Sequence, residues 1–291
     1  MPNFTGPDWL IVLALVVFGL VVGSFLNVVI RRLPVMLERQ WRGECLALLA
    51  DDGQVNDAPP SDERFDLVSP RSRCPECATP IRAVDNIPVL SWIFLRGRCR
   101  GCGQRISVEY PIVEIASAAL AVVAISHFGL GWMGLFVVVF SWLLLTAAVI
   151  DLHTTLLPDD LTLPLLWLGL IGAALGVTGV TPVDAIIGAA VGYLILWGLY
   201  HAFRLLTGKE GMGYGDFKLL AALGAWTGWQ GLPVTILLSS VVGAAMGIGL
   251  IAILGRDRNI PIPFGPYLAA GGWVALFWGD ELTRAYLASV T

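Results

Sequence analysis

The sequence is poor in charged residues. Only 14% of its 291 residues are charged, whereas 56% are hydrophobic and 11 are tryptophan. A chain with so few charges cannot cover the surface of an ordinary soluble domain. The composition therefore indicates a polytopic membrane protein that is surrounded by a lipid bilayer.

Several catalytic and binding signatures are also absent. The sequence contains no Gly-x-Ser-x-Gly, His-Glu-x-x-His or Walker sequence, so serine hydrolases, zinc proteases and NTPases lack their minimum parts. The net charge of -4 argues against nucleic-acid binding, because such a surface needs basic residues to replace phosphate counterions. We therefore expect no nucleic-acid partner.

Long apolar runs divide the chain. Residues 9–30 carry no charge and are long enough to cross a hydrocarbon core of roughly 30 Å as a helix. Further runs follow at 110–127, 132–150, 161–178, 183–203, 217–230, 232–254 and 262–278. The predicted fold is an all-α integral membrane protein with about eight transmembrane helices. Its predicted parts are a first transmembrane helix at 1–31, an extramembrane domain at 32–107 and a transmembrane core of about seven helices at 108–291.

Basic residues are distributed unevenly between the two sides of this arrangement. Of the 18 Lys and Arg residues, 12 lie between Arg31 and Arg105, and the next are Arg204, Lys209 and Lys218. With eight spans these clusters fall on one side, which the positive-inside tendency identifies as cytoplasmic. The N-terminus is then expected outside.

Cysteines organise the segment 32–107, the only extramembrane segment that is large enough to fold. Two Cys-x-x-Cys pairs, separated by 21 residues, have nearly the spacing of a four-thiolate zinc site. Two disulfides would need an oxidising compartment, and a thioredoxin-like redox pair would need only one motif. Because the segment is too short for a substantial apolar core, a metal would supply much of its folding free energy. We predict a structural zinc ion held by Cys74, Cys77, Cys99 and Cys102, and treat Cys45 as incidental.

Two aspartates lie at the ends of apolar runs. Asp151 follows the run 132–150, and Asp216 lies at the start of another run, directly after Gly213-Tyr-Gly215. One such acid is best explained as a helix cap or as the partner of a basic residue. Two acids on one membrane face, one of them beside glycines that would admit a peptide, indicate an aspartyl hydrolase. One carboxylate would deprotonate the attacking water, and the other would donate a proton to the scissile carbonyl.

Other polar residues receive mainly structural interpretations. Asp159 and Asp160 follow Pro158 and are predicted to cap a helix. Glu114 lies inside an apolar run and either lines a substrate groove or meets a polar partner. His153 is interpreted as an interface histidine. Close helix packing is predicted at three Gly-x-x-x-Gly pairs, Gly172/Gly176, Gly188/Gly192 and Gly243/Gly247.

The order of several motifs resembles that of the bacterial type IV prepilin peptidases over nearly the whole chain. These motifs are the two cysteine pairs, Gly23-Ser-Phe-Leu-Asn-Val-Val-Ile-Arg-Arg-Leu-Pro34, Glu109-Tyr-Pro-Ile-Val-Glu114, Ile150-Asp-Leu152 and Gly211-Met-Gly-Tyr-Gly-Asp-Phe-Lys218. The resemblance implies a bifunctional enzyme of pilus biogenesis and type II secretion in the bacterial inner membrane, with a periplasmic N-terminus. Such an enzyme removes the leader of prepilins and pseudopilins at the cytoplasmic face, using Asp151 and Asp216 as its catalytic aspartates. It then N-methylates the new N-terminal residue with S-adenosylmethionine.

The site of the methyl donor is less defined. Gly211-x-Gly-x-Gly215 does not qualify as a nucleotide-binding fingerprint, because no strand precedes it. We expect the donor near the cysteine-bearing segment with Trp92–Arg98.

An alternative from another class is an ion- or proton-coupled transporter with a regulatory zinc loop, which would also use paired acids. A peptidase without methyltransferase activity is a third possibility, against which the retained cysteine pairs argue.

Overall fold

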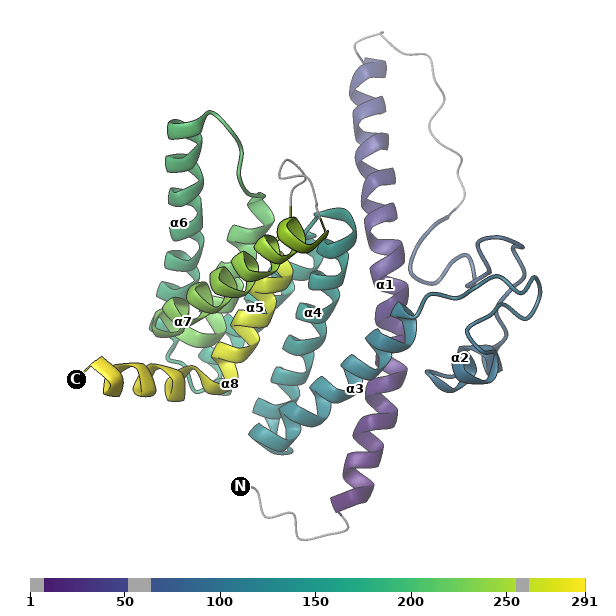
Figure 1. Cartoon of the computed structure of the whole chain (residues 1–291), viewed down its shortest axis with the longest axis horizontal. Helices are drawn as coiled ribbons and strands as arrows, with labels where there is room; N and C mark the ends of the chain where they lie inside the picture. The colour runs from purple at the N-terminus through teal and green to yellow at the C-terminus, as the bar shows by residue number, and fades with distance from the viewer. Residues whose placement is uncertain (1–7, 52–63, 255–261, 291) are drawn as a thin grey trace. The chain divides into compact units, whose positions relative to one another are not determined.

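The structure is a computed structural model that describes residues 8–51, 64–254 and 262–290, and it is mainly helical (Figure 1). Within these residues there is no extended strand, and β pairing is limited to two isolated bridges, Arg73–Pro80 and Arg98–Arg105. The chain forms two compact units, and the boundary between them lies after Val122. The predicted all-helical membrane fold is confirmed.

The first unit contains α1 (Asp8–Asp51), the 3-10 helix η1 (Ala83–Asn86), α2 (Leu90–Phe94) and most of α3 (Glu109–Phe128). Helix α1 continues well beyond residue 31, where the first span was predicted to end. The residues after Pro34 are mostly good helix formers, and Glu38 and Arg42 form an ion pair one turn apart. The apolar run therefore did not predict where α1 ends.

Helices α1 and α3 are in backbone contact at two glycines. A Cβ atom on Gly19 would lie 2.5 Å from the Cα atom of Ala118, and one on Gly23 would lie 2.6 Å from the Cα atom of Glu114. The buried Ser117 hydroxyl donates to the Gly19 carbonyl at 2.7 Å. Gly19 and Gly23 have the spacing of close helix pairs, but they were not among the predicted pairs.

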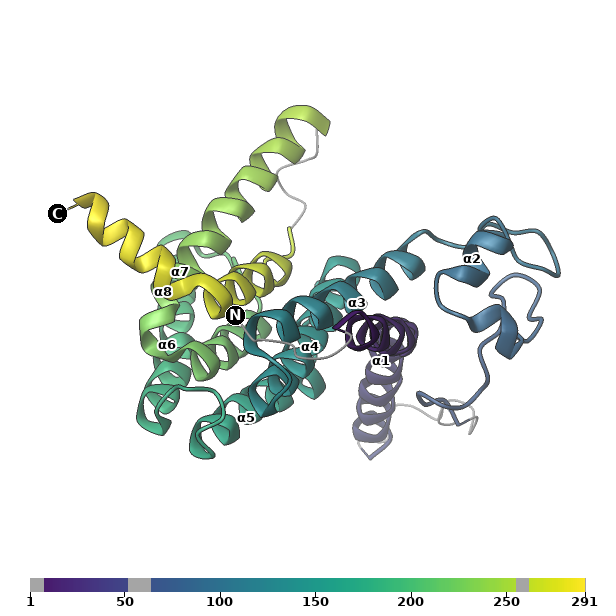
Figure 2. The same cartoon turned by 90° about the horizontal axis from the view of Figure 1, so that it is seen from below.

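The second unit contains the end of α3 and five further helices. These are α4 (Trp132–Thr154), α5 (Asp159–Ala174), α6 (Pro182–Thr207), α7 (Tyr214–Leu254) and α8 (Gly265–Val290). Helix α7 packs against α5, α6 and α8 (Figures 1 and 2). Its first half carries the fully buried side chains of Phe217, Leu220, Leu223 and Trp226, so this half forms the centre of the unit.

Small residues allow α6 and α7 to touch. A Cβ atom on Gly188 would lie 2.2 Å from the carbonyl oxygen of Gly224, and one on Gly192 would lie 2.6 Å from that of Leu220. The prediction of close packing at Gly188/Gly192 is therefore confirmed. The prediction for Gly172/Gly176 is wrong, because α5 ends at Ala174 and Gly176 has a φ of 68° beyond the helix.

The eight predicted spans correspond to seven helices of the described chain. The runs 217–230 and 232–254 both lie in α7, where Gly228 leaves helical geometry with φ 68° and ψ 174°. The two halves of α7 therefore run in different directions, as Figure 2 shows. Five helices among the described residues are long and apolar enough to cross a membrane, namely those at Trp9–Leu49, Glu109–Phe128, Trp132–Thr154, Pro182–Thr207 and Tyr214–Gly249.

Candidate active site and cysteine cluster

The two predicted acids lie together in the second unit. Asp151 is in the last turn of α4, and Asp216 is in the first turn of α7. Both side chains are buried, with exposed fractions of 4% and 7%. They are close enough to interact electrostatically. Helix ends that are far apart in the sequence thus bring two carboxylates into one buried site.

The start of α8 holds the Asp151 carboxylate. Asp151 Oδ2 accepts the backbone N–H of Gly265 at 3.0 Å. That N–H is available because the first N–H groups of a helix have no intrahelical partner. A Cβ atom on Gly265 would lie 2.6 Å from Oδ2, so a larger residue at this position would displace the carboxylate. Sequence reasoning missed Gly265, although the following Pro266 is a typical mark of a helix start.

The loop after α4 connects the surroundings of the two acids. Thr155 ends α4 in a left-handed conformation with a φ of 52°. Leu157 then packs against both Gly215 and Gly265. Its Cβ atom would lie 2.7 Å from a Cβ on Gly215, and its Cδ1 atom would lie 3.1 Å from one on Gly265. Close packing against Leu157 therefore accounts for the glycine directly before Asp216.

The surroundings of Asp216 are less occupied than those of Asp151. Its Oδ1 atom is buried and has no hydrogen-bond partner among the described residues. Leaving a buried polar atom unpaired costs roughly 1–3 kcal/mol, so such an atom calls for an explanation. A Cβ atom on Gly213 would be 3.9 Å from Asp216 Oδ2, which leaves this side of the carboxylate uncrowded. The geometry suits a carboxylate that meets a water molecule or a substrate carbonyl.

Asp159 forms an ion pair instead of the predicted cap. Lys218 Nζ lies 2.6 and 2.7 Å from the two carboxylate oxygens of Asp159. The N-cap residue of α5 is Pro158, and no side chain caps this helix. The capping prediction is thus wrong, although Asp159 and Asp160 both lie in the first turn, where the helix dipole favours acids. The pair joins the first turns of α5 and α7, next to Asp216.

The four predicted metal ligands form a cluster in the first unit. The Sγ atoms of Cys74, Cys77, Cys99 and Cys102 all lie within 4.8 Å of one another. The Cys74–Cys102 and Cys77–Cys99 Sγ distances are 3.8 and 3.9 Å. A disulfide would require about 2.05 Å, whereas a tetrahedron with metal–sulfur bonds of about 2.3 Å has edges of about 3.8 Å. The cluster can hold a metal ion.

Two similar turns present these cysteines. The N–H of Cys74 donates to Thr79 at 3.0 Å, and the N–H of Cys99 donates to Gln104 at 2.8 Å. The residue after each second cysteine has a positive φ, which is 55° at Ala78 and 72° at Gly103. Hydrogen bonds from the side chain and backbone of Thr79 lower the pKa of the Cys77 thiol to about 6. This favours the thiolate form, which binds metals.

The remaining candidates are Glu114, His153 and Cys45. Glu114 is buried in α3 and has a polar partner, since its Oε2 accepts the backbone N–H of Val89 at 2.7 Å. His153 is exposed near the end of α4. Cys45 is an exposed free cysteine of α1 and is not part of the cluster.

Two protein-family models match this chain. Residues 17–128 match the bacterial peptidase A24 N-terminal domain, and residues 138–248 match the type IV leader peptidase family. The first match ends at the last residue of α3. The second contains both Asp151 and Asp216.

Relatives are similar over almost their full length. A protein of Aeromonas salmonicida called prepilin leader peptidase/N-methyltransferase is 55% identical over 98% of this chain and 97% of its own length. Proteins of the same name from Aeromonas hydrophila and Stutzerimonas stutzeri are 55% and 52% identical, over 98% and 95% of this chain and 96% and 93% of their own lengths. No solved structure matches.

Proposed function

The chain belongs to the type IV leader peptidase family, and from this premise we propose that it removes the leader of type IV prepilins and N-methylates the new N-terminus. The observation that carries the proposal is the buried pair Asp151 and Asp216 within the part of the chain that matches the family model. The family assignment favours this function over the transporter alternative.

We assign cleavage to the two aspartates acting on one water molecule. Adjacent carboxylates do not both ionise easily, so the pair shares a proton. The ionised member takes a proton from the water, whose oxygen attacks the scissile carbonyl carbon, while the protonated member donates to the carbonyl oxygen. When the intermediate collapses, the C–N bond breaks, the amine leaves with the proton that the first aspartate took from the water, and the second aspartate regains its proton as the carboxyl product forms. The N–H of Gly265 orients Asp151 during these steps, and the unpaired Oδ1 of Asp216 supports its contact with water or substrate.

The proposed location is the cytoplasmic face of the bacterial inner membrane, with a periplasmic N-terminus. The basic residues between Arg31 and Arg105 support this orientation. Asp151 at the end of α4 and Asp216 at the start of α7 then lie on the cytoplasmic side. We propose type II secretion pseudopilins as further substrates, because the chain resembles enzymes that process both classes.

We propose that the bound metal is zinc and that its role is structural. Four cysteine sulfurs within 4.8 Å of one another fit a structural zinc site, in which four protein ligands occupy every position of the metal. S-adenosylmethionine would supply an electrophilic methyl group to the new N-terminal amine. We place that step in the first unit, because a separate family model matches residues 17–128 and because this part contains neither aspartate.

The proposal is tested by incubating the purified protein in detergent with a prepilin, with and without S-adenosylmethionine, and measuring product masses. We expect loss of the leader, followed by a gain of one methyl group only when the donor is present. Asp151→Asn and Asp216→Asn should each lower the cleavage rate by at least about a thousandfold, because neither amide can exchange the proton. Asp280→Asn, an exposed acid of α8, serves as the control. Wild-type processing by either active-site variant would refute the assignment.

A further inference from the structure

The first unit contains a buried carboxylate for which the proposed chemistry provides no role. Glu114 has an exposed fraction of 7% and lies where α1 and α3 are in backbone contact. Its Oε2 accepts the N–H of Val89 at 2.7 Å, and its backbone touches Gly23 of α1. A buried acid is costly unless its partners are well placed. The contact therefore joins α1 and α3 to the residue that precedes α2.

That residue has an unusual backbone conformation. Val89 is the N-cap of α2 and has φ 57° and ψ -50°. A positive φ is disfavoured for a β-branched side chain, and such strain persists only where surrounding contacts hold it. The Glu114 carboxylate provides such a contact, because it binds the N–H of Val89 directly. The direction in which α2 leaves the helix pair thus depends on Glu114.

Helix α2 is in turn attached to the second cysteine turn. The indole N–H of Trp92 donates to the Ile106 carbonyl at 3.3 Å. The same ring packs on Gly97, where a Cβ atom would lie 2.8 Å from it. Arg100, which follows Cys99 in that turn, forms an ion pair with Asp85 of η1 at 2.5 Å. A change in the direction of α2 would therefore shift the cysteine cluster relative to α1 and α3.

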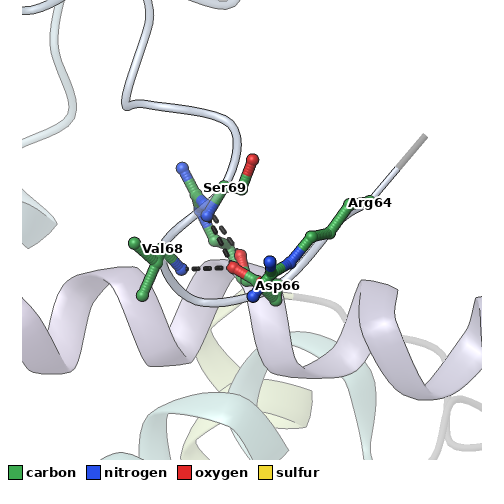
Figure 3. A network of polar contacts seen from close by, with 5 residues as sticks. Arg64, Asp66, Val68 and Ser69 are labelled. Atoms are coloured by element: carbon green, nitrogen blue, oxygen red, sulfur yellow. Dashed lines mark hydrogen bonds and ion pairs between the residues drawn. The ribbon is translucent and has the colours of Figure 1, made fainter.

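The other end of the cysteine-bearing segment has an attachment of its own. Arg32 of α1 donates to the carbonyls of Asp66 and Pro70 at 2.8 and 2.6 Å. The turn that contains Asp66 is closed by its own hydrogen bonds (Figure 3). Loss of the Glu114 contact would consequently reorient α2 without detaching the segment or removing a metal ligand.

We propose that Glu114 is a positioning residue for methyl transfer, which fixes α2 and the cysteine cluster on the α1–α3 pair. This inference rests on the proposed function, because it assumes that methyl transfer belongs to the first unit. Glu114 and Val89 belong to the first unit, whereas both aspartates belong to the second, so we expect cleavage not to depend on Glu114. The contact accounts for the presence of an acid at a buried position in α3.

The test uses the full-length protein in detergent with a prepilin and S-adenosylmethionine. We compare Glu114→Ala, Glu114→Gln and, as the control, Glu38→Gln, which makes the same chemical change at an exposed position of α1. For Glu114→Ala we expect methylation to slow at least about tenfold, because misplacement of a reacting group has costs of this order. Cleavage and metal content should stay at wild-type levels. Glu114→Gln should recover part of the methylation, since its amide oxygen can still accept the Val89 N–H.

Amide hydrogen exchange of residues 89–94 provides a second readout. Exchange should be faster in Glu114→Ala than in the wild type and unchanged in Glu38→Gln. Wild-type methylation by Glu114→Ala, or an equal loss of methylation, cleavage and metal, would overturn the proposal. If the wild type cleaves but does not methylate, the second half of the proposed function fails. The hydrogen-exchange measurement then tests only whether Glu114 positions α2. Unchanged exchange of residues 89–94 in Glu114→Ala would show that it does not.

Discussion

Asp66 organises the turn that attaches the cysteine-bearing segment to α1, as Figure 3 shows. Its Oδ1 accepts the backbone N–H groups of Ser69 and Val68 at 2.6 and 2.7 Å, and its Oδ2 accepts Arg64 Nε at 2.6 Å. These donors, the Ser69 N–H first among them, lower the pKa of Asp66 from 3.8 to about 2. A single side chain therefore stabilises the turn through its ionised form.

The stability of this turn should depend on pH in a defined window. Because the pKa is lower in the folded turn, the stabilisation is complete above about pH 4 and is lost as the pH falls through about 2. We expect the amide protection of Val68 and Ser69 to decrease over this window in the wild type. Asp66→Asn should abolish this pH-dependent decrease in amide protection, which hydrogen exchange measures. Glu76→Gln, a substitution at an exposed acid, should leave the decrease unchanged. A step that persists in Asp66→Asn would assign it to another group.

The elements that carry the two acids are joined near their ends. Leu157, in the loop after α4, packs between Gly215 and Gly265. Two residues later, Asp159 pairs with Lys218 of α7. These contacts restrain the end of α4 relative to the start of α7, and hence Asp151 relative to Asp216. The ion pair is partly exposed, so its own contribution to the free energy of unfolding should be at most about 1 kcal/mol.

The ion pair should therefore affect turnover more than stability. We expect Asp159→Asn to lower kcat for leader cleavage by about tenfold with little change in KM, because small displacements of reacting groups have large effects. The thermal unfolding temperature should change little. The exchanged pair, Asp159→Lys with Lys218→Asp, should recover part of the lost kcat. Asp160→Asn, at the next position, is the control, and an equal loss of kcat in this control would exclude a specific role of the pair.

At the scale of the whole molecule, the sequence predicted what depends on residue type and spacing. The meeting of Asp151 with Asp216 and of the four cysteines with one another could be predicted, because acids at the ends of apolar runs and paired Cys-x-x-Cys motifs are rare without a function. The contacts of Gly265 with Asp151 and of Glu114 with Val89 could not be predicted from the sequence, since each depends on how distant segments of the chain meet. The break between the runs 217–230 and 232–254 was also predicted, and the structure places it at Gly228 as a kink within α7.

The division into two units leads to a prediction about metal removal. The aspartates, Leu157 and Gly265 all belong to the second unit, whereas the cysteine cluster belongs to the first. In small domains a structural zinc ion contributes about 10–16 kcal/mol of apparent binding free energy, so a cluster without its metal is expected to unfold locally. Such unfolding would leave the contacts between α4, α7 and α8 in place.

We therefore expect Cys74→Ser or Cys99→Ser to release the metal and abolish methylation, while leader cleavage slows far less. Metal analysis of the purified variants, together with product masses from a prepilin and S-adenosylmethionine, measures all three effects. Cys45→Ser is the matched control, because Cys45 is an exposed cysteine outside the cluster and should leave every readout unchanged. Wild-type protein without zinc would refute the metal assignment. Equal loss of both activities in a cluster variant would instead show that cleavage needs the folded cysteine segment, since the four cysteines are remote in sequence from both aspartates.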